Sequence, residues 1–125
     1  HGLHPADPYE AARHEAVMAA VEDLRAMVQP SARLPDDAKR EAREVLAATS
    51  LPAWGRFVEA QLGEGPFYAG AKPSVVDVKL YVGVRAFRNG VMDYIPTTVF
   101  DGSPKLIRLC DAVAAHPAVK AWYAR

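Results

Sequence analysis

A serine and a carboxylate three residues apart are the side chains in this 125-residue chain whose types and spacing most readily suggest chemistry. They are Ser74 and Asp77, in the run Gly70-Ala-Lys-Pro-Ser-Val-Val-Asp77. A hydroxyl beside a carboxylate could be catalytic, but this spacing just before an apolar run is also typical of a helix capping box. In that box each side chain accepts a hydrogen bond from the backbone N–H of the other residue. We therefore interpret Ser74 and Asp77 as a structural helix cap.

Two adjacent carboxylates, Glu22 and Asp23, lie at an unfavourable place for acidic residues. They fall late in the first expected helix, where the negative end of the helix dipole disfavours carboxylates. From the residues alone two interpretations stay open. One is a solvated acidic pair, and the other is a site for an external cationic partner.

The other reactive side chains predict no catalytic site. Cys110 lies on the apolar face of its expected helix, so we expect a small core residue and not a nucleophile. His116 precedes a proline and is expected to end a helix rather than act as a general base. His1 and His4 have no further metal ligand nearby, so no metal site is expected. The chain contains no glycine-rich phosphate loop and no CxxC, HExxH or GxSxG motif.

The composition indicates one ordinary globular domain. Half of the residues are hydrophobic, and 15 basic residues balance 15 acidic ones, so no basic stripe points to nucleic acid. A single cysteine cannot form an internal disulfide, which fits a reducing compartment. No apolar run approaches the about 18–20 residues that a membrane-spanning helix needs. We expect a cytoplasmic domain that binds neither nucleic acid nor membrane.

The elements that must position these residues are expected to be helices. Asp7 as N-cap and Pro8 at the first helical position start a helix that should run to about Val28. A long helix follows over about 35–62. Pro52 lies inside it and should either kink it or divide it into two abutting helices; we favour the kink.

Three more helices complete the expected fold. Gly63 is a plausible left-handed C-cap for the long helix. The helix after Ser74 is apolar nearly all round and should be the buried centre of the domain, with Gly83 allowing a neighbouring helix to approach closely. Ser103 should cap the next helix, and the last begins at Pro117. No strand-like alternation is present, so we predict an all-α fold of five or so helices in an orthogonal or up-down bundle.

Four segments carry a resemblance to a known family. They are Asp7-Pro-Tyr-Glu-Ala-Ala, Val21-Glu-Asp-Leu-Arg25, the stretch from Gly65-Pro-Phe-Tyr-Ala-Gly to Asp77, and His116-Pro-Ala-Val-Lys-Ala-Trp122. Their order and spacing resemble the C-terminal helical domain of cytosolic glutathione S-transferases, most of all the sigma, pi, alpha and mu types. The resemblance covers essentially the whole chain, with residues 1–6 as a remnant of the interdomain linker.

The resemblance implies a protein with a second domain that this chain lacks. In the family a thioredoxin-like N-terminal domain holds most of the glutathione site and the catalytic Tyr, Ser or Cys, so no catalytic residue is expected here. The full-length homodimer would conjugate the glutathione thiolate to hydrophobic electrophiles, with glutathione as co-substrate and no metal. The helical domain would supply the wall of the electrophile pocket and dimer contacts. The alternative is a non-catalytic assembly module of the translation elongation factor or synthetase-complex type.

The resemblance also assigns candidate site residues. Asp23 matches the position whose carboxylate pairs with the α-amino group of glutathione bound to the other subunit. Arg25, Val28 and Pro30 fall at or near positions that line the electrophile pocket. The family often has bulky apolar or aromatic groups there, so Arg25 and Pro30 depart from its pattern.

Overall fold

The computed structural model describes residues 5–124, and within them every regular element is a helix. One isolated bridge between Phe67 and Gly70 is the only β-type pairing in that range. The all-α prediction is confirmed. The elements are α1 (Pro8–Val28), the 3-10 helix η1 (Gln29–Arg33), α2 (Asp36–Ala48), α3 (Ser50–Gln61), α4 (Val75–Arg88), α5 (Pro104–Ala115) and α6 (Pro117–Tyr123).

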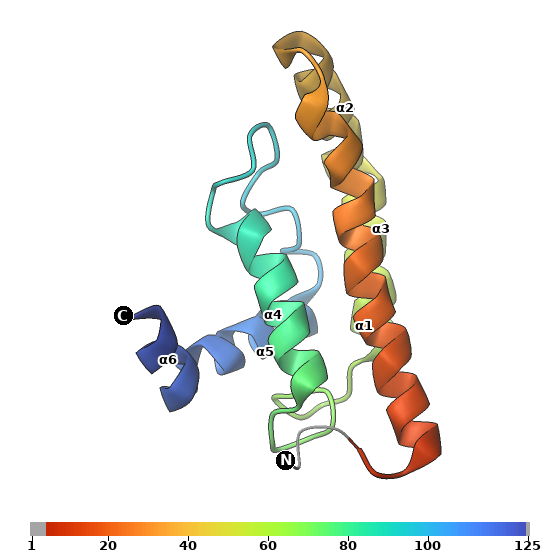
Figure 1. The fold of residues 1–125 in the computed structure, drawn as a ribbon, viewed down its shortest axis with the longest axis vertical. Helices are drawn as coiled ribbons and strands as arrows, with labels where there is room; N and C mark the ends of the chain where they lie inside the picture. The colour runs from red at the N-terminus through yellow and green to blue at the C-terminus, as the bar shows by residue number, and fades with distance from the viewer. Residues whose placement is uncertain (1–4, 125) are drawn as a thin grey trace.

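The long helix α1 forms one edge of the molecule, and α2 and α3 return behind it (Figure 1). Its start follows the prediction: the Asp7 carboxylate accepts from the Glu10 backbone N–H at 2.9 Å, and Pro8 stands at the first helical position. Helix α4 lies beside α1, and α5 crosses α4 before the chain ends in α6. The core lies between these helices, where Phe100 contacts the rings of Trp54 and Phe87.

The preference for one kinked helix over residues 35–62 was wrong, because α2 and α3 are separate helices. The break falls at Thr49, three residues before Pro52. Pro52 has no N–H to donate to the Ala48 carbonyl, and its ring would clash with that carbonyl in a continuous helix. Helix α2 therefore ends at Ala48, and Pro52 lies in the first turn of α3, where a missing N–H costs little.

The beginning of α4 is as predicted, but the helix is not buried on every side. The capping box of Ser74 and Asp77 is present. Gly83 allows the predicted close approach, since a Cβ there would lie 2.8 Å from Val21 Cγ1 on α1. The outer face, however, exposes Val75, Val78 and Val82. The sequence pattern showed that the helix is apolar nearly all round, but it could not show that one of its apolar faces is exposed to solvent in this chain.

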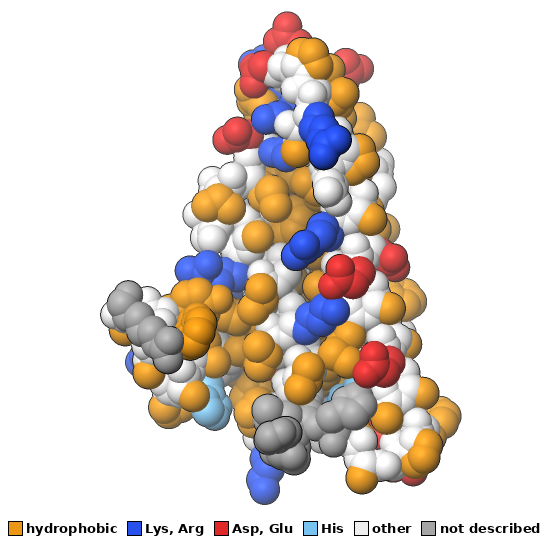
Figure 2. Space-filling view, in the orientation of Figure 1, with side chains coloured by type: hydrophobic (Ala, Val, Ile, Leu, Met, Phe, Trp, Pro, Cys, Tyr) orange, Lys and Arg blue, Asp and Glu red, His pale blue; other side chains and the backbone are white. Residues whose placement is uncertain are grey.

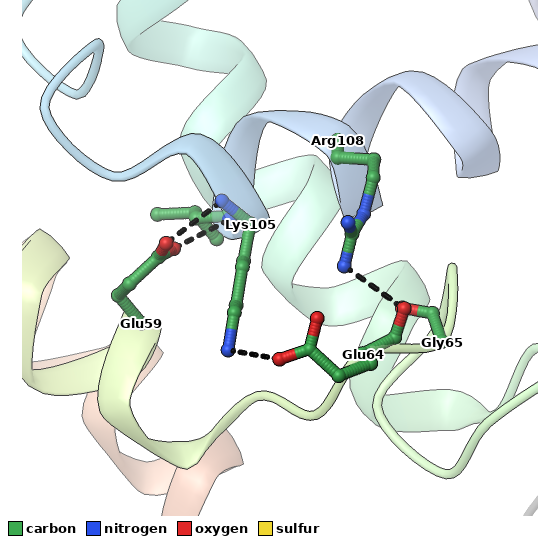
Figure 3. Close-up of polar contacts among 6 residues, drawn as sticks. Glu59, Glu64, Gly65, Lys105 and Arg108 are labelled. Carbon is green, nitrogen blue, oxygen red and sulfur yellow. Dashed lines mark hydrogen bonds and ion pairs between the residues drawn. The ribbon is translucent and has the colours of Figure 1, made fainter.

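Helix α5 begins at Pro104 as predicted, but a different residue caps it. Ser103 makes no side-chain cap hydrogen bond. Instead the carboxylate of Glu59 on α3 accepts from the backbone N–H groups of Lys105 and Leu106, both at 2.8 Å (Figure 3). An anionic acceptor at a helix N-terminus satisfies orphan N–H groups and suits the helix dipole. The cap of α5 therefore also anchors it to α3.

A second set of polar contacts holds the loop after α3 against α5. Lys105 Nζ lies 3.1 Å from the Glu64 carboxylate, and Arg108 donates to the backbone oxygens of Glu64 and Gly65 (Figure 3). The predicted left-handed C-cap at Gly63 was wrong, because the only glycines with positive φ in residues 5–124 are Gly70 and Gly90. Helix α3 ends instead through an extended Leu62.

Candidate ligand-binding site

A cavity of about 640 Å³ lies between α1 and α4 and is called here the α1–α4 pocket. Figure 2 shows hydrophobic side chains on the surface between the two helices, with Lys and Arg side chains beside them. Residues from α1, η1, α2, α4 and the loop after α4 line it: Val21, Glu22, Leu24, Arg25, Val28, Gln29, Ala32, Arg43, Lys79, Val82, Gly83, Ala86, Phe87 and Met92. A mostly apolar cavity with a few polar groups is the usual form of a small-molecule site.

The apolar wall of the pocket follows from how α1 and α4 pack. Val21, Leu24 and Val28 recur on one face of α1, and Phe87 lies on the facing side of α4 with 3% of its surface exposed. Because Gly83 has no side chain, the two helices approach closely at Val21. The α1–α4 pocket lies between these same two helices.

An ion pair crosses the pocket from α1 to α4. Lys79 Nζ lies 2.9 Å from the Glu22 carboxylate. The hydrogen bond to Lys79, with its positive charge and that of Arg25, lowers the pKa of Glu22. Both partners are substantially exposed to solvent, so the pair adds little to stability. It does, however, neutralise the only carboxylate in the pocket wall.

Arg43 enters the pocket wall from α2 and is the only buried residue of that helix. Its Nε donates to Ser31 Oγ at 2.9 Å, and its Nη1 donates to the Asp93 backbone oxygen at 3.1 Å. The Ser31 hydroxyl in turn donates to the Val28 backbone oxygen at 2.6 Å. Two acceptors from distant parts of the chain thus fix the guanidinium in place.

The structure places the four predicted binding residues differently. Arg25 and Val28 line the α1–α4 pocket. Pro30 lies in η1, exposed and outside the pocket lining. Asp23 is exposed on α1 and also lies outside the lining. Sequence reasoning missed Arg43 and Lys79, because only the packing of α2 and α4 against α1 brings them to this place.

The other sequence candidate, Ser74 with Asp77, forms a closed structural network. Asp77 is fully buried. Its Oδ2 accepts from the backbone N–H and the hydroxyl of Ser74 at 2.7 and 2.9 Å, and its Oδ1 accepts from the Tyr68 backbone N–H at 2.7 Å. Both carboxylate oxygens are therefore occupied by the chain itself. The carboxylate caps α4 and fixes the preceding loop.

The remaining reactive side chains have structural positions. Cys110 is buried in the core, and burial raises the pKa of its thiol to about 12, so it is no nucleophile near neutral pH. His116 Nδ1 accepts from the Ala118 backbone N–H at 3.2 Å, which is the predicted helix-end role. His1 and His4 lie outside the described residues. Within residues 5–124 no group of three or more His, Cys, Asp and Glu could hold a metal ion.

Comparison with known proteins gives three findings. The family model described as "Glutathione S-transferase, C-terminal domain" matches residues 22–125. The chain is 29% identical over 122 residues to the glutathione S-transferase class-mu 26 kDa isozyme 1 of Fasciola hepatica, covering 98% of this chain and 52% of that protein. The solved structure of rat hPGDS complexed with a quinoline superposes with a TM-score of 0.81 at 20% identity, covering 98% of this chain and 59% of that one.

The chain matches only part of each of these two proteins. The chain spans about half the length of the Fasciola relative and of the rat structure. At 20% identity the rat structure shows the fold of the chain and no more.

No helix in residues 5–124 is long and apolar enough to cross a membrane.

Proposed function

The chain belongs to the family of glutathione S-transferase C-terminal domains, and on that premise we propose that it is the helical part of a dimeric enzyme that conjugates glutathione to hydrophobic electrophiles. In this proposal a thioredoxin-like domain supplies the glutathione thiolate. The helical domain binds the electrophile, orients it and excludes water. The enzyme works in the cytoplasm in the detoxification of such compounds.

The observation that carries the proposal is the α1–α4 pocket. It has a volume of about 640 Å³, its lining is largely apolar, and two of the residues expected at an electrophile site, Arg25 and Val28, lie in its wall. An electrophile held there loses translational freedom before the thiolate attacks it, which is a general source of rate enhancement. No side chain of this chain takes part in bond making.

We assign the contact with glutathione to Asp23. Its carboxylate is exposed on α1 and forms no ion pair with any of residues 5–124. In the dimer it would pair with the charged α-amino group of glutathione bound to the other subunit. A carboxylate this late in a helix is disfavoured by the helix dipole, and an external ammonium group would offset that cost. Asp23 would therefore be a binding residue and not a catalytic one.

The outer face of α4 is where we place the thioredoxin-like domain. Val75, Val78 and Val82 recur at i, i+3 and i+7 and expose 38%, 42% and 53% of their surfaces. Such a row on one helix face is typical of a contact surface. Val82 also lines the α1–α4 pocket, so a domain docked there would reach the electrophile directly.

The test uses the full-length protein. Retention on immobilised glutathione and enzyme-dependent conjugation of glutathione to chlorodinitrobenzene are expected. In that reaction a bond forms between the glutathione sulfur and the ring carbon, and chloride leaves with the electron pair of the broken C–Cl bond. Retention without conjugation would contradict the catalytic proposal, and the absence of both would contradict glutathione binding as well.

A further inference from the structure

We propose that Arg43 forms an anion subsite in the α1–α4 pocket, so that the preferred electrophile is a hydrophobic molecule that carries a carboxylate. This inference rests on the proposed transferase function and names the substrate class of the same pocket. The evidence is the placement of Arg43, the charges around it and the apolar length of the pocket.

Arg43 is a buried cation with no carboxylate partner in the part of the chain that the structure describes. Only 6% of its surface is exposed. It forms no ion pair with a carboxylate in residues 5–124. Taking a charge out of water is unfavourable unless an opposite charge and hydrogen bonds compensate for the lost hydration. An anionic ligand would supply the missing charge.

The guanidinium is held rigidly with N–H groups left over. A guanidinium has five N–H donors, and the described contacts of Arg43 engage Nε with Ser31 Oγ and Nη1 with the Asp93 backbone oxygen. Both of these acceptors are neutral. Nη2 donates to no acceptor in residues 5–124, and the side chain lines the pocket. A planar guanidinium with free donors is well suited to carboxylate recognition.

The rest of the pocket wall adds positive charge. Its charged members are Arg25, Arg43, Lys79 and Glu22, three cations against one carboxylate. Glu22 is already paired with Lys79 at 2.9 Å. Arg25 forms no ion pair within residues 5–124. The electrostatic preference of the pocket is therefore for an anion.

The polar groups lie apart, with apolar surface between them. Arg43 contacts Ser31, whose hydroxyl binds the Val28 carbonyl at the end of α1, whereas Glu22 lies six residues earlier on the same helix. At a rise of about 1.5 Å per residue these positions are about 9 Å apart along the helix. Leu24 on α1 and Val82 on α4 belong to the apolar lining of the same pocket. The pocket suits a ligand with an apolar body and an acid at the Arg43 end.

The experiment compares two electrophiles with the same reacting carbon in the full-length protein. The probes are a chlorodinitrobenzoate and its methyl ester. In both, the glutathione thiolate forms the C–S bond and chloride leaves with the C–Cl electron pair. The probes differ in the negative charge, in the ester methyl group and in the intrinsic reactivity of the ring, and the uncatalysed rates correct for the last of these. The measured quantity is the ratio of kcat/KM for the acid to kcat/KM for the ester, corrected for the uncatalysed rates.

The subsite predicts an acid-to-ester ratio above one in the wild-type protein. In Arg43→Gln the ratio should fall about tenfold, because a charge-assisted hydrogen bond to the carboxylate is lost. Arg40→Gln is the matched control, since it removes an exposed arginine of the same helix that lies outside the pocket lining, and it should keep the wild-type ratio. If Arg43→Gln does not fold, Arg25→Gln tests the same wall and should lower the ratio by a smaller factor.

The outcomes separate the two proposals. Conjugation of the ester with no preference for the acid, or equal losses for both probes in Arg43→Gln and Arg25→Gln, would overturn the anion subsite and leave the transferase function standing. No conjugation of either probe by a wild-type protein that conjugates chlorodinitrobenzene would also overturn the subsite. No conjugation of any of the three compounds would instead overturn the proposed function itself.

Discussion

Two stretches of α4 have different roles: the first stabilises the fold, and the second lines the α1–α4 pocket. At its first turn, Asp77 is fully buried and both of its carboxylate oxygens are bound by Ser74 and Tyr68. From about half a turn to two turns later, Lys79, Val82 and Gly83 line an open pocket. The first stretch has no capacity left for a ligand, while the second has apolar surface and charges directed at one. Changes at the first turn should therefore alter stability, and changes along the pocket should alter binding.

The largest effect is expected at the cap of α4. Asp77→Ala should lower the free energy of unfolding by about 2–4 kcal/mol, because several buried donors lose their acceptor at once. Urea denaturation followed by tryptophan fluorescence measures it. Asp101→Ala, an exposed carboxylate in a loop, is the control and should stay within about 0.5 kcal/mol of the wild type. An unchanged denaturation midpoint for Asp77→Ala together with lost activity would contradict the structural role of Asp77 and make it a functional residue.

Asp23 should show the opposite pattern. Asp23→Ala in the full-length dimer is expected to weaken glutathione binding about tenfold, or about 1.4 kcal/mol, because the α-amino group loses its charge partner. The free energy of unfolding should change by no more than about 0.5 kcal/mol, as for other exposed positions. Titration calorimetry gives the affinity, with Glu41→Ala, an exposed carboxylate on α2, as the matched variant. Equal affinities for Asp23→Ala and the wild type would rule out the assignment.

Gly83 both allows the close packing of α4 on α1 and lines the pocket. Its substitution should have the smallest effect on the free energy of unfolding or binding among these three. A Cβ at this position would lie 2.8 Å from Val21 Cγ1, so Gly83→Ala should cost about 1–3 kcal/mol from overpacking. Alanine regains about 1 kcal/mol of helix propensity, which leaves a net loss of about 0–2 kcal/mol. Thermal unfolding measures it. A net gain in stability would show that α1 can move away and that the close approach is not required.

The parts of the fold that depend on neighbours in sequence could be predicted. The cap of α4 joins residues three apart, and Asp7 caps α1 over the same separation, so both are visible in the chain as written. The family resemblance rests on the same local signals. The break between α2 and α3 was predicted less well, because Pro52 showed that a disruption occurs but its effect falls at Thr49.

The parts that depend on packing could not be predicted. Glu59 caps α5 from 46 and 47 residues away, and no local pattern connects it to Lys105 and Leu106. Arg43 meets Asp93 across 50 residues of sequence. An arginine on a polar helix is usually solvated, as Arg40 is on this one, and only the tertiary structure shows that Arg43 is buried and lines a pocket. Of the residues that line this pocket, the sequence singled out Arg25 and Val28, and their role toward an electrophile stays a prediction.

The most direct measurement fills the α1–α4 pocket and follows the two Michaelis constants of the full-length enzyme separately. Ala86→Trp places a large ring in the pocket wall at a residue outside the α4 face proposed for the thioredoxin-like domain. Ala112→Trp makes the same change at another half-buried helical alanine, on α5, that lies outside the lining of this pocket. Ala86→Trp is expected to raise the KM for chlorodinitrobenzene at least about tenfold, while the KM for glutathione and both constants of Ala112→Trp stay near the wild type. Equal electrophile constants in the two variants would contradict the assignment of this pocket to the electrophile.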